Sequence, residues 1–247
     1  MFIIYIYIFI IGAIIGSFLN VCIYRIPKKE SVVFPPSHCP NCGYKIKWYD
    51  NIPIISYFIL LRGKCRQCKT KISLQYPLVE LLTGILFLGV FIRYGNSILT
   101  IKYMILTGLL IVLSGIDIEK HILPDKLTFS MLIIGFVLSF FSEINILYSF
   151  IGAATFSFPF MLIYGFGEDI LKKEIMGFGD VKLTAAIGAF WGYRGFYSLY
   201  VFFMLAFTIG AIVSLILIGL KIKTRKDIIA FGPFIAIAGY ILVLGLY

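Results

Sequence analysis

Four of the five cysteines form two Cys-x-x-Cys pairs in one polar segment, Cys39 with Cys42 and Cys65 with Cys68, 22 residues apart. Two such pairs can place four thiolates around one tetrahedral Zn²⁺, and a four-sulfur site leaves no coordination position open for chemistry. The pattern therefore predicts a structural zinc site. Two disulfides are the alternative, which a reducing compartment disfavours. The fifth cysteine, Cys22, lies in an apolar stretch and is predicted to be a small core residue.

Two aspartates stand at the ends of apolar segments, Asp117 after Ser-Gly-Ile and Asp180 in Gly-Phe-Gly-Asp. Ionisable groups at membrane depth are expensive and therefore indicate function. Two neighbouring carboxyl groups tend to share a proton, so one can accept a proton from water while the other polarises a peptide carbonyl. That is the chemistry of an aspartic peptidase. Flanking glycines Gly177 and Gly179 are expected to let a substrate approach closely and to tolerate unusual backbone angles.

Other interpretations of the acidic residues stay open on spacing alone. The spacing of the two aspartates also fits water-facing helix caps, or a proton or ion relay as in a proton-coupled transporter. Glu119, His121 and Asp125 could form a metal cluster. Glu80 lies inside an apolar segment, so we expect it to pair with a basic loop residue or to line a second site.

The composition places these residues in a membrane. Of 247 residues, 60% are hydrophobic and only 14% are charged, and the mean hydropathy is +0.98. This excludes soluble, disordered, fibrous and small secreted classes. The sequence predicts an all-α polytopic membrane protein with about eight transmembrane helices. The predicted spans are Phe2–Tyr24, Pro77–Ile92, Ile98–Ile116, Leu127–Phe141, Ile146–Gly167, Val181–Gly192, Phe196–Leu220 and Ile228–Tyr247.

The basic residues orient this layout. Nineteen of the 22 lysines and arginines fall on one side of the eight predicted spans, the cluster Lys221–Lys226 among them. By the positive-inside rule that side is cytoplasmic and both termini lie outside. The net charge of +10 is then a topology signal rather than a sign of nucleic-acid binding. The first span is expected to be a retained helix, and the cysteine segment, residues 25–75, a small cytoplasmic zinc-binding domain.

The order of these motifs resembles the bacterial type IV prepilin leader peptidases, which are bifunctional aspartic peptidases and N-methyltransferases of the GxGD type. The matching segments are Gly16–Pro27, the two cysteine pairs, Tyr76–Glu80, Ile116–Asp117 with Leu123–Asp125, and Gly177–Leu183. The resemblance implies that Asp117 and Asp180, and not Asp125, are the catalytic pair. It implies cleavage of the leader of type IV prepilins or pseudopilins, which serve pili, secretion or DNA uptake, at the cytoplasmic face of the bacterial inner membrane.

The same resemblance implies methylation of the new N-terminal residue with S-adenosylmethionine. It divides the chain into an N-terminal methyltransferase part, residues 1–95, and a peptidase membrane domain, residues 96–247. No Gly-x-Gly-x-x-Gly motif indicates a methyl-donor site. Polarity and position alone suggest four residues as cofactor contacts: Asn20, Tyr24, Arg25 and Glu80.

Overall fold

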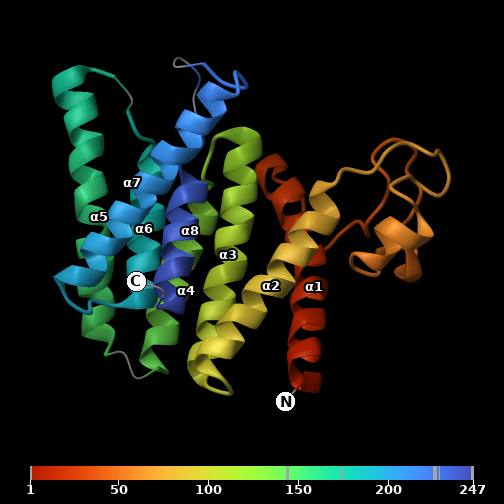
Figure 1. Cartoon of the computed structure of the whole chain (residues 1–247), viewed down its shortest axis with the longest axis horizontal. Helices are drawn as coiled ribbons and strands as arrows, with labels where there is room; N and C mark the ends of the chain where they lie inside the picture. The colour runs from red at the N-terminus through yellow and green to blue at the C-terminus, as the bar shows by residue number, and fades with distance from the viewer. Residues whose placement is uncertain (1, 143–144, 174, 225–226, 228, 246–247) are drawn as a thin grey trace. The chain divides into compact units, whose positions relative to one another are not determined.

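The computed structural model describes residues 2–142, 145–173, 175–224, 227 and 229–245. Eight α-helices account for most of this part of the chain, and no strand occurs in it (Figure 1). The fold class is therefore all-α, as predicted. The helices are α1 (Phe2–Arg25), α2 (Gln75–Tyr94), α3 (Ile98–Lys120), α4 (Asp125–Phe140), α5 (Ile146–Gly165), α6 (Phe178–Trp191), α7 (Phe196–Gly219) and α8 (Gly232–Leu244).

Five of these helices, α1, α2, α3, α5 and α7, are long and apolar enough to cross a bilayer. Helices α4, α6 and α8 have only 16, 14 and 13 residues. At 1.5 Å per residue, a 14-residue helix spans about 21 Å, less than the roughly 30 Å hydrocarbon core. The chain is a multi-pass membrane protein, while eight crossings remain a prediction. Both ends of the predicted span Ile228–Tyr247, and Arg225 and Lys226 of the basic cluster, lie outside the described residues.

The chain divides into two compact units, Met1–Asn96 and Ser97–Tyr247. In the first unit α1 packs against α2 through small residues. A Cβ atom on Gly12 would lie 2.8 Å from the Cα of Gly84, and one on Gly16 would lie 2.8 Å from the Cα of Glu80. Glycines four residues apart let two apolar helices approach at backbone distance, which lipid-facing helices use in place of a hydrophobic driving force. This close approach sets Glu80 against α1.

The segment between α1 and α2 is irregular, with three short helical turns at Ile26–Lys28, Trp48–Asn51 and Ser56–Leu60. An ion pair joins two of its parts. Asp50 accepts from Nε and Nη2 of Arg66 at 2.6–3.1 Å, and the Asp50 side chain is only 2% exposed. This hydrogen bonding raises the pKa of Arg66. A bidentate pair of this kind fixes geometry as well as charge, so it orders the segment around the second cysteine pair.

In the second unit α6 is the central helix, packed against α3, α4, α5 and α8 (Figure 1). Ten of its 14 residues are buried. It meets α5 at two glycines, where a Cβ atom on Gly152 would lie 2.5 Å from the carbonyl oxygen of Gly188. The buried residues run from Asp180 to Trp191, while Phe178 and Lys182 at the start of the helix are partly exposed. Asp180 is therefore the first buried position of α6.

A buried cation also lies in this unit. Lys102 of α3 is 1% exposed, and its ammonium group donates to the hydroxyls of Ser139 and Ser142 at 2.9 and 3.3 Å. Ser139 in turn donates to carbonyl oxygens of Gly135 and Ala189. These bonds tie α3 to α4 and α4 to α6, and hydrogen bonding of a buried charge is what makes its burial tolerable.

Candidate active site and metal centre

Asp117 lies in the last turn of α3 and is only 6% exposed. Its Oδ2 accepts a hydrogen bond of 2.9 Å from the backbone N–H of Gly232, the first residue of α8. The helix ends three residues later, where His121 takes a left-handed conformation and its N–H bonds to the carbonyl of Asp117. A carboxylate fixed by a backbone donor cannot rotate freely, so α8 sets the direction in which Asp117 points.

Asp180 lies in the first turn of α6 and is 7% exposed. The backbone N–H of Gly177, the residue that caps this helix, reaches its carboxylate, and the charge of Asp117 acts on it. The packing of α3 against α6 thus brings together two acidic side chains that stand 63 residues apart in the sequence. Two adjacent buried carboxyl groups share protons rather than ionising together, which suits paired acid and base chemistry.

The burial of both aspartates does not fit the interpretation that they are water-facing helix caps. The alternative cluster of Glu119, His121 and Asp125 does not form either, because these three side chains do not converge on a common point in the described structure. Asp125 instead pairs with Lys182 at 2.6 Å on the surface. Among the described residues, the sole group of three or more side chains of metal-ligand type is formed by the cysteines.

The two glycines before Asp180 act differently from the sequence-based expectation. Gly177 has ordinary extended angles, φ −70° and ψ 139°, and Gly179 is not among the described glycines with positive φ. These glycines matter because they lack a side chain, and not because they adopt unusual backbone angles. A Cβ atom on Gly179 would lie 2.9 Å from the Cβ of Leu123, whereas one on Gly177 would meet only Asp180 Oδ2, at 3.7 Å. Gly179 thus allows close packing, and Gly177 leaves room beside the carboxylate.

The bond between Gly232 and Asp117 gives a first testable prediction. A Cβ atom on Gly232 would lie 2.7 Å from Asp117 Oδ2, which is closer than real Cβ contacts. The resemblance implies that Asp117 is a catalytic residue of a prepilin peptidase; on that expectation Gly232→Ala displaces the carboxylate and slows the reaction by about tenfold or more, because small misplacements of catalytic groups are costly. The measurement is leader removal from a co-expressed prepilin.

Gly219→Ala is the matched control, because a Cβ atom there meets nothing within 4 Å. It should process the prepilin at the wild-type rate. Wild-type processing by Gly232→Ala as well would show that the bond to Asp117 has no part in catalysis.

The four cysteines of the loop come together as predicted. Their sulfur atoms all lie within 4.8 Å of one another, with Cys39 3.8 Å from Cys68 and Cys42 3.9 Å from Cys65. A tetrahedral Zn²⁺ with Zn–S bonds of about 2.3 Å requires sulfur separations of roughly 3.8 Å. All four are free thiols, so neither of the two disulfides forms. The cluster has the donors and the spacing of a metal site.

Each cysteine pair is shaped by the same local turn. The N–H groups of Cys39 and Cys65 donate to the carbonyls of Tyr44 and Thr70, each five residues on, at 2.9 Å. The residue after each pair, Gly43 or Lys69, has a positive φ. Because the same local turn forms at both pairs, the short Cys-x-x-Cys motif is enough to fix the geometry of each pair.

Thr70 favours the thiolate form of Cys68, which is the form that binds metals. The hydroxyl of Thr70 lies 3.1 Å from the Cys68 sulfur. Hydrogen bonds from the side chain and backbone of Thr70 lower the pKa of Cys68 to about 5. Thiolates, not thiols, ligate metals, so this sulfur is ready to bind at neutral pH.

The four suggested methyl-donor residues all lie in the first unit but differ in their contacts. Asn20 is buried and donates to the carbonyls of Gly16 and Tyr76, which ties α1 to α2. Tyr24 is 41% exposed, with the Lys28 ammonium 3.4 Å above its ring. Arg25 is buried and lines a pocket. Glu80 lies outside the residues that line this pocket.

Glu80 does not pair with a basic loop residue, which corrects one of the two expectations for it. Its Oε2 accepts the backbone N–H of Ile54 at 2.7 Å, and Ser17 also hydrogen-bonds to it. The partners of Glu80 at the contact of α1 and α2 are therefore a hydroxyl group, that of Ser17, and a backbone amide, that of Ile54. Ile54 has a φ of +62°, which costs a β-branched residue about 1–3 kcal/mol. Glu80 therefore holds a strained turn in place.

Sequence patterns did not indicate several residues that the structure places at these sites. Gly232 is one, and its position just before Pro233 at a helix start was the available signal. Ser17 and Asn51 line the pocket beside Arg25. Ser17 belongs to the matching segment Gly16–Pro27, but neither residue carries a charge that would have singled it out before the fold was known.

Comparison with known proteins places these features in a family. Residues 10–94 match the family model for the bacterial peptidase A24 N-terminal domain, and residues 104–215 match that for the type IV leader peptidase family. A search of the solved structures gives no significant match.

Similar proteins include prepilin leader peptidase/N-methyltransferases from three bacteria. The chain is 36% identical to that of Myxococcus xanthus, over 86% of this chain and 63% of the relative. It is 35% identical to that of Xanthomonas campestris, over 94% and 88%, and 36% identical to that of Neisseria gonorrhoeae, over 94% and 87%. The chain thus spans less than two thirds of the first relative and most of the other two. These names give no support to the transport alternative. The chain belongs to the family of type IV prepilin leader peptidases and N-methyltransferases.

Proposed function

We propose that this chain removes the leader peptide of type IV prepilins or pseudopilins and methylates the new N-terminus, with Asp117 and Asp180 as the catalytic pair. One observation supports this assignment most directly. The second unit encloses two carboxyl groups together, each less than 10% exposed, at the ends of two packed helices. Membrane-embedded carboxyl groups without function would be expensive to retain. The relatives' shared name supplies the reaction and the substrate class.

The proposed peptidase step uses both carboxyl groups. The ionised one takes a proton from a water molecule, whose oxygen forms a bond to the scissile carbonyl carbon. The protonated one gives its proton to the carbonyl oxygen, so a tetrahedral diol forms without a free charge. Collapse of the diol breaks the C–N bond as the leaving nitrogen takes up a proton, which restores the carbonyl. Gly232 keeps Asp117 aligned, and Gly177 leaves space beside Asp180 for the substrate backbone.

Methylation is assigned to the first unit, which holds the cysteine cluster and matches the N-terminal family model. S-adenosylmethionine would supply an activated methyl group. The neutral α-amine of the cleaved pilin forms the new N–C bond with its lone pair. The electron pair of the broken C–S bond stays on sulfur, and the amine loses a proton to water. We propose Zn²⁺ as the metal at the cysteines, with a structural role, because four sulfurs leave it no open position.

The orientation in the membrane is also part of the proposal. The first unit carries ten lysines and arginines between Arg25 and Lys71, the segment that holds the cysteine cluster. The positive-inside rule places such a segment in the cytoplasm, where thiolates persist. Both sites would then face the cytoplasmic side of the inner membrane, on which the leader of an inserted prepilin lies.

One experiment tests both activities. The chain is co-expressed with a type IV prepilin, and the mass of the mature pilin is measured. We expect the mass of the leaderless polypeptide plus one methyl group, about 14 Da. Retention of the leader would contradict the peptidase assignment. A leaderless but unmethylated N-terminus would contradict the methyltransferase assignment alone.

A further inference from the structure

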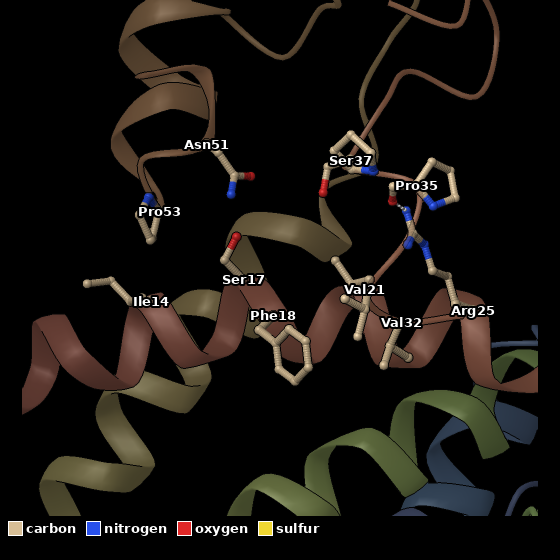
Figure 2. A pocket seen from close by; sticks show the side chains of 12 residues that line it. Ile14, Ser17, Phe18, Val21, Arg25, Val32, Pro35, Ser37, Asn51 and Pro53 are labelled. Atoms are coloured by element: carbon tan, nitrogen blue, oxygen red, sulfur yellow. Dashed lines mark hydrogen bonds between the residues drawn. The ribbon is translucent and has the colours of Figure 1, made fainter. Parts of the chain in front are cut away.

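The pocket beside Arg25 has a volume of about 370 Å³ and lies entirely within the first unit. Its floor is one face of α1, with Ser17 and Val21. Its walls come from the loop, from residues 32–37 and from Asn51 and Pro53. Figure 2 shows the Ser17, Ser37 and Asn51 side chains directed into the space between the helix and the loop. Pockets that bind drug-sized ligands begin at roughly 300 Å³.

Arg25 gives this pocket its chemical character. The residue is only 6% exposed, and its guanidinium donates to the carbonyls of Ser31 at 2.9 Å and Pro35 at 2.7 Å. Neither ion pair in the described part of the chain involves it. Carbonyl oxygens satisfy donors but carry no charge to balance a guanidinium. A buried cation of this kind, in the wall of a pocket, favours a ligand with a carboxylate.

The remaining lining separates polar from apolar groups. Ser17, Ser37 and Asn51 offer two hydroxyls and an amide, while Phe18, Val21 and Val32 offer apolar surface. A ligand that fits has a carboxylate, hydroxyl groups and a flat aromatic ring whose faces can pack against apolar side chains. S-adenosylmethionine has all three, in its methionine, ribose and adenine parts.

Glu80 stabilises the pocket without lining it. Its carboxylate bonds to Ser17, on the floor, and to the N–H of Ile54, the residue after Pro53. The strained φ of Ile54 persists because this bond holds it. Glu80 is thus a positioning residue, which connects Ser17 of α1 to the loop at Ile54.

We propose that this pocket is the methyl-donor site, with Arg25 binding the methionine carboxylate of S-adenosylmethionine and the apolar side chains enclosing its adenine. The proposal rests on the methyltransferase function proposed above. It assigns Arg25 as a binding residue and Ser17, Ser37 and Asn51 as hydrogen-bonding partners of the ligand.

The test is equilibrium binding to the full chain, purified in detergent. The probes are S-adenosylhomocysteine, which keeps the carboxylate, and 5′-methylthioadenosine, which lacks it. Wild-type protein should prefer S-adenosylhomocysteine by about tenfold or more, since a hydrogen bond to a charged group contributes roughly 1.5–3 kcal/mol. Arg25→Gln should lose that preference, with the two affinities becoming nearly equal.

Because Arg25→Gln also loosens the loop, a second variant fills the pocket instead. Val21→Phe removes no hydrogen bond and should weaken binding of both probes by about tenfold or more. Ile10→Phe introduces the same side chain at a 48% exposed position of α1 and should bind both probes as the wild type does. Metal content and elution volume check that each variant is folded.

The outcomes separate the site from the function. If the wild type methylates a co-expressed prepilin but folded Val21→Phe binds both probes with wild-type affinity, the pocket is not the methyl-donor site. If the wild type neither binds the probes nor methylates, the methyltransferase function fails, and the site assignment with it. An unchanged probe preference in folded Arg25→Gln would overturn the role of Arg25.

Discussion

Replacing Asp117 or Asp180 with asparagine is expected to abolish leader removal, with a loss of about 1,000-fold or more in rate. The asparagine amide keeps the size of the side chain but neither accepts a proton from water nor donates one to the carbonyl, and each of these transfers contributes about 10²–10⁴-fold. The measurement is the fraction of a co-expressed prepilin that loses its leader over time. Both variants should be inserted in the membrane at wild-type levels.

Asp125→Asn is the matched control for this experiment. Asp125 lies shortly after Asp117 in the sequence, but its side chain is exposed and pairs with Lys182 on the surface. An exposed ion pair contributes roughly 0–1 kcal/mol, so this variant should retain most of the activity. Normal processing by either Asp117→Asn or Asp180→Asn would refute the catalytic assignment. Loss of activity only in Asp125→Asn would move the chemistry to the surface pair.

Removing the cysteine cluster should have the second large effect. Wild-type protein in detergent should contain about one zinc ion per chain, measured by elemental analysis, and Cys39→Ser/Cys65→Ser should contain none. Structural zinc contributes apparent binding free energies of about 10–16 kcal/mol to small domains. The segment between α1 and α2 should therefore lose its ordered fold in the variant, become sensitive to protease, and no longer support methylation.

Cys22→Ala provides the control, because Cys22 is buried in α1 and away from the cluster. It should keep its zinc and its protease resistance. A metal-free wild-type preparation with an equally resistant loop would show that the four sulfurs need no metal. The double variant should also be assayed for leader removal. Because Asp117 and Asp180 both lie in the second unit, this assay shows whether the peptidase depends on the cysteine cluster of the first unit.

The cysteine site could be predicted almost completely from the sequence. Each pair is shaped by hydrogen bonds that reach only five residues along the chain, so the motif itself carries the geometry. The spacing of the cysteines in the sequence did not show how the two pairs come together, and this was decided by the fold. The existence of eight apolar helices was equally readable, since hydropathy is a property of short windows. The first seven predicted spans begin and end within four residues of α1 to α7, whereas α8 (Gly232–Leu244) is shorter than the predicted span Ile228–Tyr247.

The amino-acid sequence by itself determined the helical class, the four cysteines that cluster and the two aspartates worth testing. Only the tertiary structure decided that Asp117 and Asp180 are buried together, and that Gly232, 115 residues away from Asp117, holds one of them. It alone placed Arg25, Ser17 and Asn51 around one pocket and gave Glu80 a backbone partner instead of a basic side chain. The physical reason is that local turns and apolar runs depend on neighbouring residues, whereas burial, charge balance and cavity shape depend on which helices pack together.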